Sequence, residues 1–305
     1  MRGVRVAVTG ASGFCGGWVA REAAARGASV VGLGRRPGPV GEHRFWDAAH
    51  AEPDLCGVDV VVHCAAAVGD PAPGARAEAA MRAVNVDGTA RLLRAAAGRP
   101  VVWVSSASVY DPRAGRERVA EGHPRTGQLN AYGRTKAAGE ALALAAGAVV
   151  LRPRAVYGPG DTQLLPRLLS RVRAGTLLLP GPDVRLSLTA VENLADACLA
   201  AVGWPPGAYN VADAAPYGRD AAVGAVLRAH GVRARIRHLP LPVARTAARA
   251  AQAAARLTGG EPALSRYAVD QLSRPVVLDL ARARSCGWIP ARTLDDHLAE
   301  VVRNA

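Results

Sequence analysis

The sequence predicts an α/β fold with a doubly wound parallel sheet, followed by a smaller and mostly helical lobe. Through the first two thirds of the chain, short Val-rich runs alternate with Ala-rich stretches. Continuous apolar strands separated by helices indicate a parallel sheet that is covered on both faces, with right-handed crossovers. In the last third, Gly and Pro clusters interrupt the chain at 158–160, 180–182 and 205–207, which indicates a lobe built over the carboxyl ends of the strands.

The alternation of these runs sets the expected order of elements. Strands are expected at 4–9, 29–33, 58–63, 101–105 and 148–151, and helices at 14–26, 78–97 and 131–146. We expect two parts. Residues 1–155, joined by 185–213, form the sheet domain, and residues 156–184 and 214–305 form the substrate-binding lobe.

The composition narrows the class of protein. Half of the 305 residues are hydrophobic, which is enough for a large core. Five cysteines without paired spacing favour free thiols in a reducing cytoplasm, and no Cys or His cluster indicates a metal site. The formal charge is +13, but the arginines are dispersed, which argues against nucleic-acid binding. No stretch of 18 residues lacks both charge and Pro, so no membrane span is expected.

A glycine-rich turn lies between the first predicted strand and helix, with the sequence Thr9-Gly10-Ala11-Ser12-Gly13-Phe14-Cys15-Gly16-Gly17. Gly10 permits the tight turn, Gly13 lets backbone N–H groups approach a pyrophosphate, and Gly16 lets the helix pack closely on the sheet. The positive end of the helix would face the phosphates. This strand–turn–helix context predicts a Rossmann-type dinucleotide site, and a plain Gly-rich turn is the alternative.

The chain contains 38 Lys and Arg residues, of which only Lys136 is a lysine. It follows Tyr132 by four residues in a predicted helix, so the two side chains share a face. Arg does not replace Lys where a compact ammonium must tune the pKa of a neighbour. The pattern predicts a Tyr/Lys catalytic pair, and a surface lysine is the alternative.

Several ordered motifs resemble the short-chain dehydrogenase/reductase superfamily, and in particular its extended, epimerase/dehydratase-like branch. The resemblance covers nearly the whole chain. Besides the GxxGxxG turn and the Tyr/Lys pair, the motifs are His63-Cys64-Ala65-Ala66, Asn85-Val86-Asp87-Gly88-Thr89, the segment 104–110 and the segment 151–160. The cofactor contacts that we expect are Gly10, Ser12, Gly13, Phe14, Cys15, Gly16, Arg35, Arg36, Asp47, Ala48, Cys64, Ala65, Ala66, Tyr132, Lys136, Pro153 and Val156.

The end of the second predicted strand favours NADP over NAD. An acidic residue there bonds the ribose 2′-OH of NAD, whereas an Arg accommodates the 2′-phosphate of NADP. In this chain Gly34 takes the acidic position, and Arg35 and Arg36 follow it. A guanidinium can bind a phosphate bidentately, so we expect NADP, with NAD as the alternative. Asp47 resembles the adenine-contacting Asp of the family.

The resemblance assigns the proton chemistry to Tyr132. The pKa of a free Tyr is about 10. We expect the ammonium of Lys136 and the positive nicotinamide of the oxidised cofactor to lower the pKa of Tyr132, so that it acts as the acid/base. Asn85 matches the Asn that supports the pair in relatives, and a helix N-cap is its alternative role.

The catalytic Ser/Thr of the family matches Ser106, whose hydroxyl would hold the substrate oxygen. Ser105 and Ser108 are competitors, and strand alternation makes Ser105 the least favoured. The further substrate contacts that we expect are Ala67, Ala107, Ser108, Tyr110 and Ala155.

Two departures from the family pattern favour a reductase or dehydrogenase. The Asn that sugar-nucleotide members place after the sixth strand is Ala155 here, and the acidic pair of the dehydratases is absent at 107–108. The segments 260–267 and 276–290 resemble the 3β-hydroxysteroid/sterol dehydrogenase-like and 3-keto-acid reductase-like subgroup, whereas 189–193 resembles both groups.

We therefore expect an NADP-dependent oxidoreductase that interconverts a secondary alcohol and a ketone on a small apolar or mixed-polarity metabolite. The alternatives are an NDP-sugar 4-epimerase or ketoreductase, and a non-catalytic dinucleotide sensor. The resemblance also implies a homodimer built through the helices at 78–97 and 131–146. Small residues on these helices allow close approach, namely Ala79, Ala80, Ala83, Ala90, Ala137, Ala138, Ala141 and Ala145.

Overall fold

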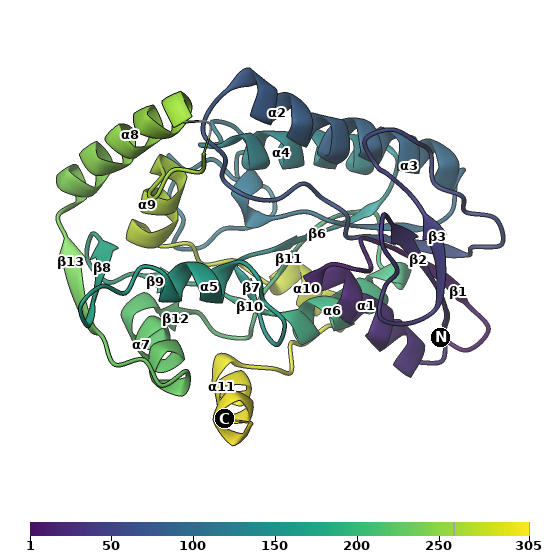
Figure 1. The fold of residues 1–305 in the computed structure, drawn as a ribbon. Helices are drawn as coiled ribbons and strands as arrows, with labels where there is room; N and C mark the ends of the chain where they lie inside the picture. The colour runs from purple at the N-terminus through teal and green to yellow at the C-terminus, as the bar shows by residue number, and fades with distance from the viewer. Residues whose placement is uncertain (259, 305) are drawn as a thin grey trace.

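The computed structural model describes residues 1–258 and 260–304. Its centre is a parallel sheet of seven strands in the order β11-β6-β5-β4-β1-β2-β3, with helices on both faces (Figure 1). The strands are β1 (Arg5–Thr9), β2 (Ser29–Gly34), β3 (Glu42–Phe45), β4 (Val60–His63), β5 (Val101–Val104), β6 (Val149–Pro153) and β11 (Gly207–Val211). The predicted class, a doubly wound parallel sheet, is confirmed.

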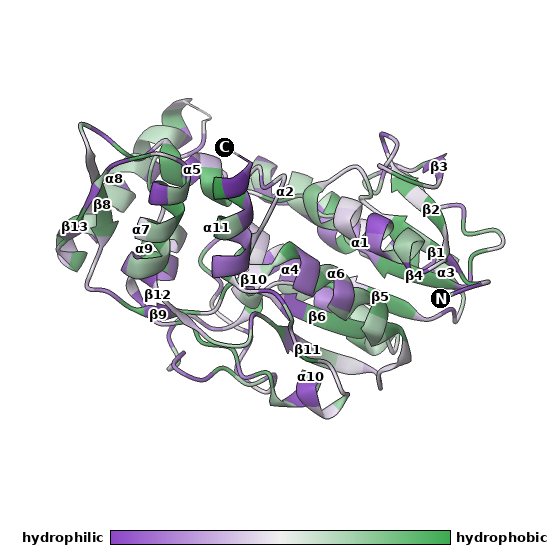
Figure 2. Cartoon of the chain, turned by 90° about the horizontal axis from the view of Figure 1, so that it is seen from below, coloured by the Kyte–Doolittle hydropathy of each residue, from purple (hydrophilic) through white to green (hydrophobic). Residues whose placement is uncertain are grey.

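Two helical layers cover the sheet. α1 (Phe14–Ala25) and α6 (Val191–Ala200) pack on one face, and α3 (Thr89–Ala96) and α4 (Ala131–Ala145) pack on the other (Figure 1). Successive side chains of a strand point to opposite faces of the sheet, so each strand contributes to both hydrophobic cores. In β1, Val6 and Val8 lie in the core under α1, whereas Ala7 lies in the core under α4. Hydrophobic colour runs along the central strands in Figure 2, as expected for strands buried on both faces.

The strand order reverses direction between β1 and β4. The chain builds outward from β1 through β2 to β3, then returns to β4 on the other side of β1. In open α/β sheets this switch point forms a crevice outside the carboxyl ends of the strands, where ligands bind. The glycine-rich turn follows β1 at this edge.

The helix predicted at 78–97 begins earlier and is not a uniform α-helix. α2 spans Ala75–Arg82, a π-helical segment η1 spans Ala83–Gly88, and α3 continues from Thr89. A π-helical turn adds a residue to the turn and re-aims the side chains that it carries. The other predicted elements are present with slightly shifted ends.

The smaller lobe is mostly helical, as expected. Its helices are α5 (Leu164–Leu169), α7 (Arg219–Ala229), α8 (Leu241–Thr258), α9 (Arg266–Ser273) and α11 (Leu294–Arg303). Three two-stranded sheets accompany them: β8 (Thr176–Pro180) with β13 (Arg235–Leu239), β7 (Val156–Tyr157) with β10 (Thr189–Ala190), and β9 (Arg185–Leu186) with β12 (Tyr217–Gly218). The short 3₁₀ turns are η2 (Ala107–Val109) and η3 (Ala201–Gly203).

Two later segments pack with the central sheet. β11 extends the sheet beside β6, and α6 packs in the core on one face of it. α10 (Ala281–Ser285) lies in the segment 214–305, which was expected to form the smaller lobe. Ala283 of this helix and Trp288 after it nevertheless lie in the same core as α1 and α6. Trp288 Nε1 donates to Asp196 at 2.6 Å. The division into two domains stays a prediction.

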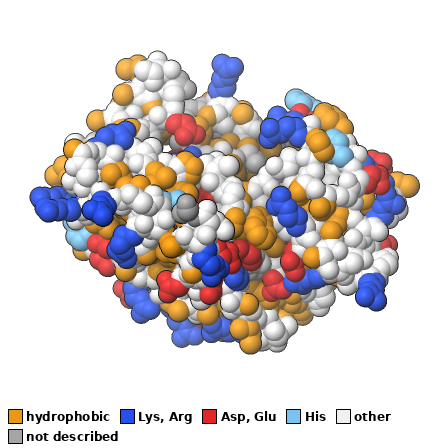
Figure 3. Space-filling model, turned by 60° about the horizontal axis from the view of Figure 1, so that its bottom comes forward, with side chains coloured by type: hydrophobic (Ala, Val, Ile, Leu, Met, Phe, Trp, Pro, Cys, Tyr) orange, Lys and Arg blue, Asp and Glu red, His pale blue; other side chains and the backbone are white. Residues whose placement is uncertain are grey.

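Charged side chains are scattered over the surface. The face shown in Figure 3 carries blue and red side chains interspersed with apolar ones, without a continuous basic stripe. Within the described ranges, no helix combines the length and the apolar character that crossing a bilayer requires.

Candidate active site

The glycine-rich turn forms a cradle of backbone N–H groups. Gly10 has φ +66°, and a Cβ there would lie 2.9 Å from the Cα of Ala65. A Cβ on Gly16 would collide with the carbonyl of Gly10, so α1 approaches the turn this closely only with glycine. Gly13 is the N-cap of α1 and is extended, and no side chain of the described residues caps this end. These features fit the pyrophosphate of a dinucleotide.

Thr9, which sequence reasoning did not single out, holds the turn against the end of β4. Its hydroxyl oxygen accepts from the N–H groups of Cys64 at 3.1 Å and Ala65 at 3.0 Å. With both lone pairs used, its O–H donates to Nδ1 of His63 at 2.7 Å. Burial lowers the pKa of His63 to about 3, so the ring is neutral and accepts this bond. The segment at His63 therefore fixes the end of β4 to the end of β1, beside the glycine-rich turn.

The residues that were expected to select the cofactor lie at the end of β2. Gly34 is buried, and Arg35 and Arg36 are exposed directly after it. The N–H of Trp46 donates to the carbonyl of Gly34 at 3.1 Å, which brings Asp47 to the same edge. The four residues therefore border one region beside the glycine-rich turn.

The Tyr/Lys pair lies in the first turns of α4. Asn130 caps the helix by accepting from the N–H of Gly133 at 2.9 Å. Ser106 follows β5, its hydroxyl oxygen accepts from the N–H of Ser108 at 3.2 Å, and the side chain lies close enough to Tyr132 to affect its pKa. Lys136 is 2% exposed, and its ammonium donates to the carbonyl of Val104 at 2.7 Å.

Asn85 supports α4 from the π-helical segment. Its Oδ1 accepts from the N–H of Ala67 at 2.8 Å, and its Nδ2 donates to Ala67 O and Thr135 Oγ1, both at 3.0 Å. Thr135 lies between Tyr132 and Lys136 in the chain. Asn85 is inside a continuous helix and caps no helix, so the N-cap alternative is wrong. The π-helical turn places the Asn85 amide so that it bonds both to Ala67, in the loop after β4, and to Thr135 on α4.

The electrostatics of the pair differ from the expectation. Burial, with the neighbouring Tyr267, raises the pKa of Tyr132 above its ordinary value, and hydrogen bonding with Ser106 opposes this only in part. Burial lowers the pKa of Lys136 to about 7, although Glu140 opposes the shift. The expected lowering also involves the positive nicotinamide of the oxidised cofactor, so a lowered pKa of Tyr132 in the complex stays a prediction. The ammonium is turned to Val104 and lies 3.7 Å from the centre of the Trp103 ring.

The comparisons with known proteins agree with this geometry. The profile of the NAD dependent epimerase/dehydratase family matches residues 6–212, which include the cradle and the Tyr/Lys pair. The chain belongs to this family. The extended short-chain dehydrogenase/reductase resemblance is thereby confirmed.

Two curated relatives are named as reductases. The chain is 31% identical over 307 residues to a 4-hydroxy-2-methyl-3-oxo-4-farnesyl-3,4-dihydroquinoline-1-oxide ketoreductase of Stigmatella aurantiaca, covering 92% of this chain and 90% of the relative. It is 29% identical over 329 residues to a 2-alkyl-3-oxoalkanoate reductase of Stenotrophomonas maltophilia, covering 97% of each. These relatives agree with the expected ketoreductase subgroup.

A solved structure shares the fold. A short-chain dehydrogenase/reductase superfamily protein of Agrobacterium tumefaciens, described with bound NAD, matches with a TM-score of 0.76 and 21% identity, covering 98% of this chain and 96% of that one. The chain is therefore an NAD(P)-dependent enzyme of the epimerase/dehydratase family by its sequence profile and relatives, and the structure agrees in fold.

Next to the site, this family member buries an ion-pair network that uses two of the expected residues. Glu140 pairs with Arg152 at 2.6 Å and accepts from Ser105 Oγ at 2.5 Å. Arg152 also donates to the hydroxyl of Tyr110 at 2.9 Å, and that hydroxyl is 2.6 Å from Asn210 Oδ1. The Ser105 hydroxyl is thus used in the bond to Glu140. Tyr110 was expected to contact the substrate, but its hydroxyl is used to tie the strand ends together.

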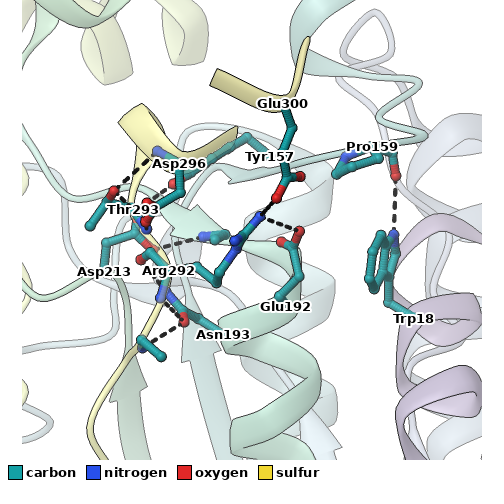
Figure 4. Close-up of polar contacts among 12 residues, drawn as sticks. Trp18, Tyr157, Pro159, Glu192, Asn193, Asp213, Arg292, Thr293, Asp296 and Glu300 are labelled. Carbon is teal, nitrogen blue, oxygen red and sulfur yellow. Dashed lines mark hydrogen bonds and ion pairs between the residues drawn. The ribbon is translucent and has the colours of Figure 1, made fainter. Parts of the chain in front are cut away.

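The segment 189–193, which resembles two family branches, has a structural role here. Asp213 accepts from Tyr157 at 2.7 Å and from Asn193 at 2.8 Å, and Asn193 Oδ1 accepts from two backbone N–H groups between α10 and α11, at Ala291 and Arg292 (Figure 4). The loop after Tyr157 is held to α1, because Trp18 Nε1 donates to the carbonyl of Pro159 at 3.0 Å (Figure 4). This loop therefore lies beside the helix that begins at the cradle.

The remaining expected residues lie in the segments at the carboxyl edge of the sheet. They are Ser12, Phe14 and Cys15 at the start of α1, Ala48 after β3, Ala66 and Ala67 after β4, Ala107 and Ser108 after β5, and Pro153, Ala155 and Val156 around the end of β6. Ala155 has φ +46°, a left-handed conformation that Asn tolerates better than Ala. The loss of the Asn of sugar-nucleotide members thus leaves a strained alanine.

Sequence reasoning missed the contribution of α9. Tyr267 lies close enough to Tyr132 to raise its pKa. Ser265, the N-cap of α9, hydrogen-bonds with Asp70 in the loop after β4, and Asn130 Nδ2 donates to the same carboxylate at 3.1 Å. These bonds hold the lobe against the start of α4. The long separation in sequence between 70, 130 and 265 left no local signal for this contact.

Proposed function

We propose that this enzyme is an NADP-dependent ketoreductase that reduces a ketone on a small apolar or mixed-polarity metabolite, with Tyr132 as the acid. The observation that carries the proposal is that Tyr132 and Lys136, in the first turns of α4, both lie near Cys15 at the start of α1, with Ser106 close to Tyr132. The raised pKa of Tyr132, caused by burial, keeps its hydroxyl protonated at neutral pH. A protonated tyrosine is the form required for reduction of a ketone. Two relatives with reductase names support this direction.

In this mechanism the chain positions the ketone and supplies one proton. A bound nicotinamide would supply the hydride to the carbonyl carbon. Ser106 Oγ holds the carbonyl oxygen in line with Tyr132, and the Tyr132 hydroxyl gives its proton to that oxygen as negative charge develops. Asn85 fixes α4 through Thr135, so the distance between the hydroxyl and the cradle is kept. The five free thiols agree with a reducing cytoplasm as the place of action.

The cofactor preference is tested by removing the two exposed guanidinium groups. The parent protein is expected to bind NADPH at least several-fold more tightly than NADH, because a 2′-phosphate gains charge-assisted hydrogen bonds. Arg35→Ala with Arg36→Ala should erase the preference while leaving the affinity for NADH unchanged. Nucleotide fluorescence titrations measure both constants. Equal affinity of the parent protein for the two cofactors would contradict the proposal.

A homodimer through α2 and α4 is part of the proposal. α2 and α4 lie side by side (Figure 1), and Ala79, Ala80, Ala141 and Ala145 are exposed on them, so small side chains line the outer face. Light scattering at micromolar concentration should report a dimer. Ala80→Arg should yield a monomer because a long charged side chain prevents close approach. Ala254→Arg on the distant α8 is the control, and a monomeric parent would refute the dimer.

A further inference from the structure

Two arginines of the site region are buried with N–H groups that lack a partner among the described residues. Arg116 and Arg154 are each 5% exposed. Nη1 of Arg116 pairs with Asp270 at 2.8 Å, whereas its Nε and Nη2 make no hydrogen bond. Arg154 donates from Nη1 to Ser187 O at 2.8 Å and from Nη2 to Gln271 O at 3.1 Å, but its Nε is unpaired. Unpaired donors on buried charged groups are costly, which indicates that a ligand completes them.

These arginines adjoin the catalytic residues. Val104 pairs with Leu151 in the sheet, so continuing both strands by two residues brings Ser106 beside the segment that precedes Arg154. Neighbouring strands are about 4.8 Å apart. Tyr267 is close enough to Tyr132, and also to Arg154 and Arg116, to interact with each electrostatically. A group bound to the two arginines would therefore lie on the same side of the molecule as Ser106 and Tyr132.

The cluster carries one net positive charge. Arg116 and Arg154 contribute two positive charges and Asp270 one negative charge, while Arg274 approaches Asp270 only at 4.0 Å and is 38% exposed. Burial lowers the pKa of Arg154 to about 10, and the charge of Arg116 adds to this effect although Tyr267 opposes it. Asp70 also lies near Tyr267, but the N-cap residues of α9 and α4 already hydrogen-bond with it. A single negative charge would neutralise the cluster.

We propose that Arg116 and Arg154 bind a carboxylate of the substrate, so that the substrate is an oxo acid with its carboxylate near the ketone, as in a 3-oxoalkanoate. This inference rests on the proposed ketoreductase function and names its substrate class. The Nε and Nη2 groups of Arg116 form one planar edge with two parallel N–H groups, which matches the two oxygens of a carboxylate. Nε of Arg154 supplies a third donor. A monoanionic carboxylate balances the charge, whereas a phosphate dianion would leave an excess negative charge in a buried site.

The test compares an acid with its neutral ester. The protein with saturating NADPH is assayed with 3-oxohexanoate, methyl 3-oxohexanoate and 2-hexanone. The parent is expected to prefer the acid over the ester by about 10–100-fold in kcat/KM, the value of one charge-assisted bidentate contact. Arg116→Lys keeps a cation for Asp270 but lacks the planar edge, so it should lower kcat/KM for the acid much more than for the ester and lose most of this preference. Arg116→Met should lose all of it.

A matched control and a binding measurement accompany the kinetics. Arg118→Met removes an arginine whose side chain is 79% exposed, and it should leave the ratio of acid to ester unchanged. Hexanoate, which cannot be reduced, should bind to the NADPH complex of the parent in calorimetry and bind at least about 10-fold more weakly to Arg116→Lys. Thermal unfolding confirms that each variant is folded.

The outcomes separate the two proposals. If the ketone and the ester are reduced in a Tyr132-dependent way but the acid is not preferred, the carboxylate site is overturned and the ketoreductase function stands. The same holds if Arg116→Lys retains the full preference. If the parent reduces none of the three compounds, the proposed function fails. Hexanoate binding that depends on Arg116 then supports the carboxylate site on its own, and its absence overturns that site.

Discussion

Tyr132→Phe is expected to lower turnover of a ketone by about 10²–10⁴-fold while NADPH binding and thermal stability stay unchanged. The substitution removes only the hydroxyl that gives the proton, and the ring continues to fill its place on α4. The loss should appear in kcat rather than in the affinity for the cofactor, because Tyr132 acts on the reacting oxygen. Stopped-flow kinetics and nucleotide titration measure the two quantities separately.

Tyr110→Phe is the matched control for this result. Its hydroxyl is also buried, but it bonds Arg152 and Asn210 instead of facing the pair. This variant should lose stability, by about 1 kcal/mol for each hydrogen bond removed, and keep most of its turnover at a temperature where it is folded. A Tyr132→Phe variant with near-parental turnover would contradict the assignment of the proton donor.

The cradle and the position of Tyr132 could be predicted because their signals are local. Gly10 and Gly16 sit where a Cβ would collide with the backbone, so glycine spacing alone reports the turn. Tyr132 and Lys136 are one helical turn apart, and the apolar runs mark β1, β2, β4, β5 and β6. Each of these features depends on residues that are close in the chain.

Features that depend on tertiary contacts could not be predicted in this way. The direction of the Lys136 ammonium is set by Val104 and Trp103 on β5, and Tyr267 contributes to the raised pKa of Tyr132, neither of which the helical spacing reports. The π-helical segment at Asn85 is maintained by bonds to Ala67 and Thr135, not by its own propensity. Tyr267 reaches the site because Ser265, the N-cap of α9, is bonded to Asp70 in the loop after β4.

Glu140→Gln is expected to destabilise the protein by about 3–5 kcal/mol, because it leaves Arg152 as a buried charge without its counter-ion. The two side chains are 0% and 2% exposed. For a chain of this size the change should lower Tm by on the order of 10 °C. Glu52→Gln is the control, since its partner Arg94 is 62% exposed and such surface pairs contribute about 0–1 kcal/mol. A similar Tm for both variants would contradict the importance of the buried pair.

The same network predicts a specific dependence on pH. Burial alone would raise the pKa of Glu140, but hydrogen bonds and charge from Arg152, with help from Ser105 and Arg125, lower it overall. The folded-state pKa therefore lies below the unfolded value of about 4.3. Stability from the carboxylate is then present above that pH and is lost as pH falls through the folded-state pKa. Glu140→Gln should consequently lose less stability than the parent between about pH 5 and pH 3. Chemical denaturation at each pH measures the difference, and parallel losses in the two proteins would show that Glu140 is not the group that responds.

A double variant, Glu140→Leu with Arg152→Met, should recover much of the stability at neutral pH, since removing both charges leaves neither one buried and unpaired.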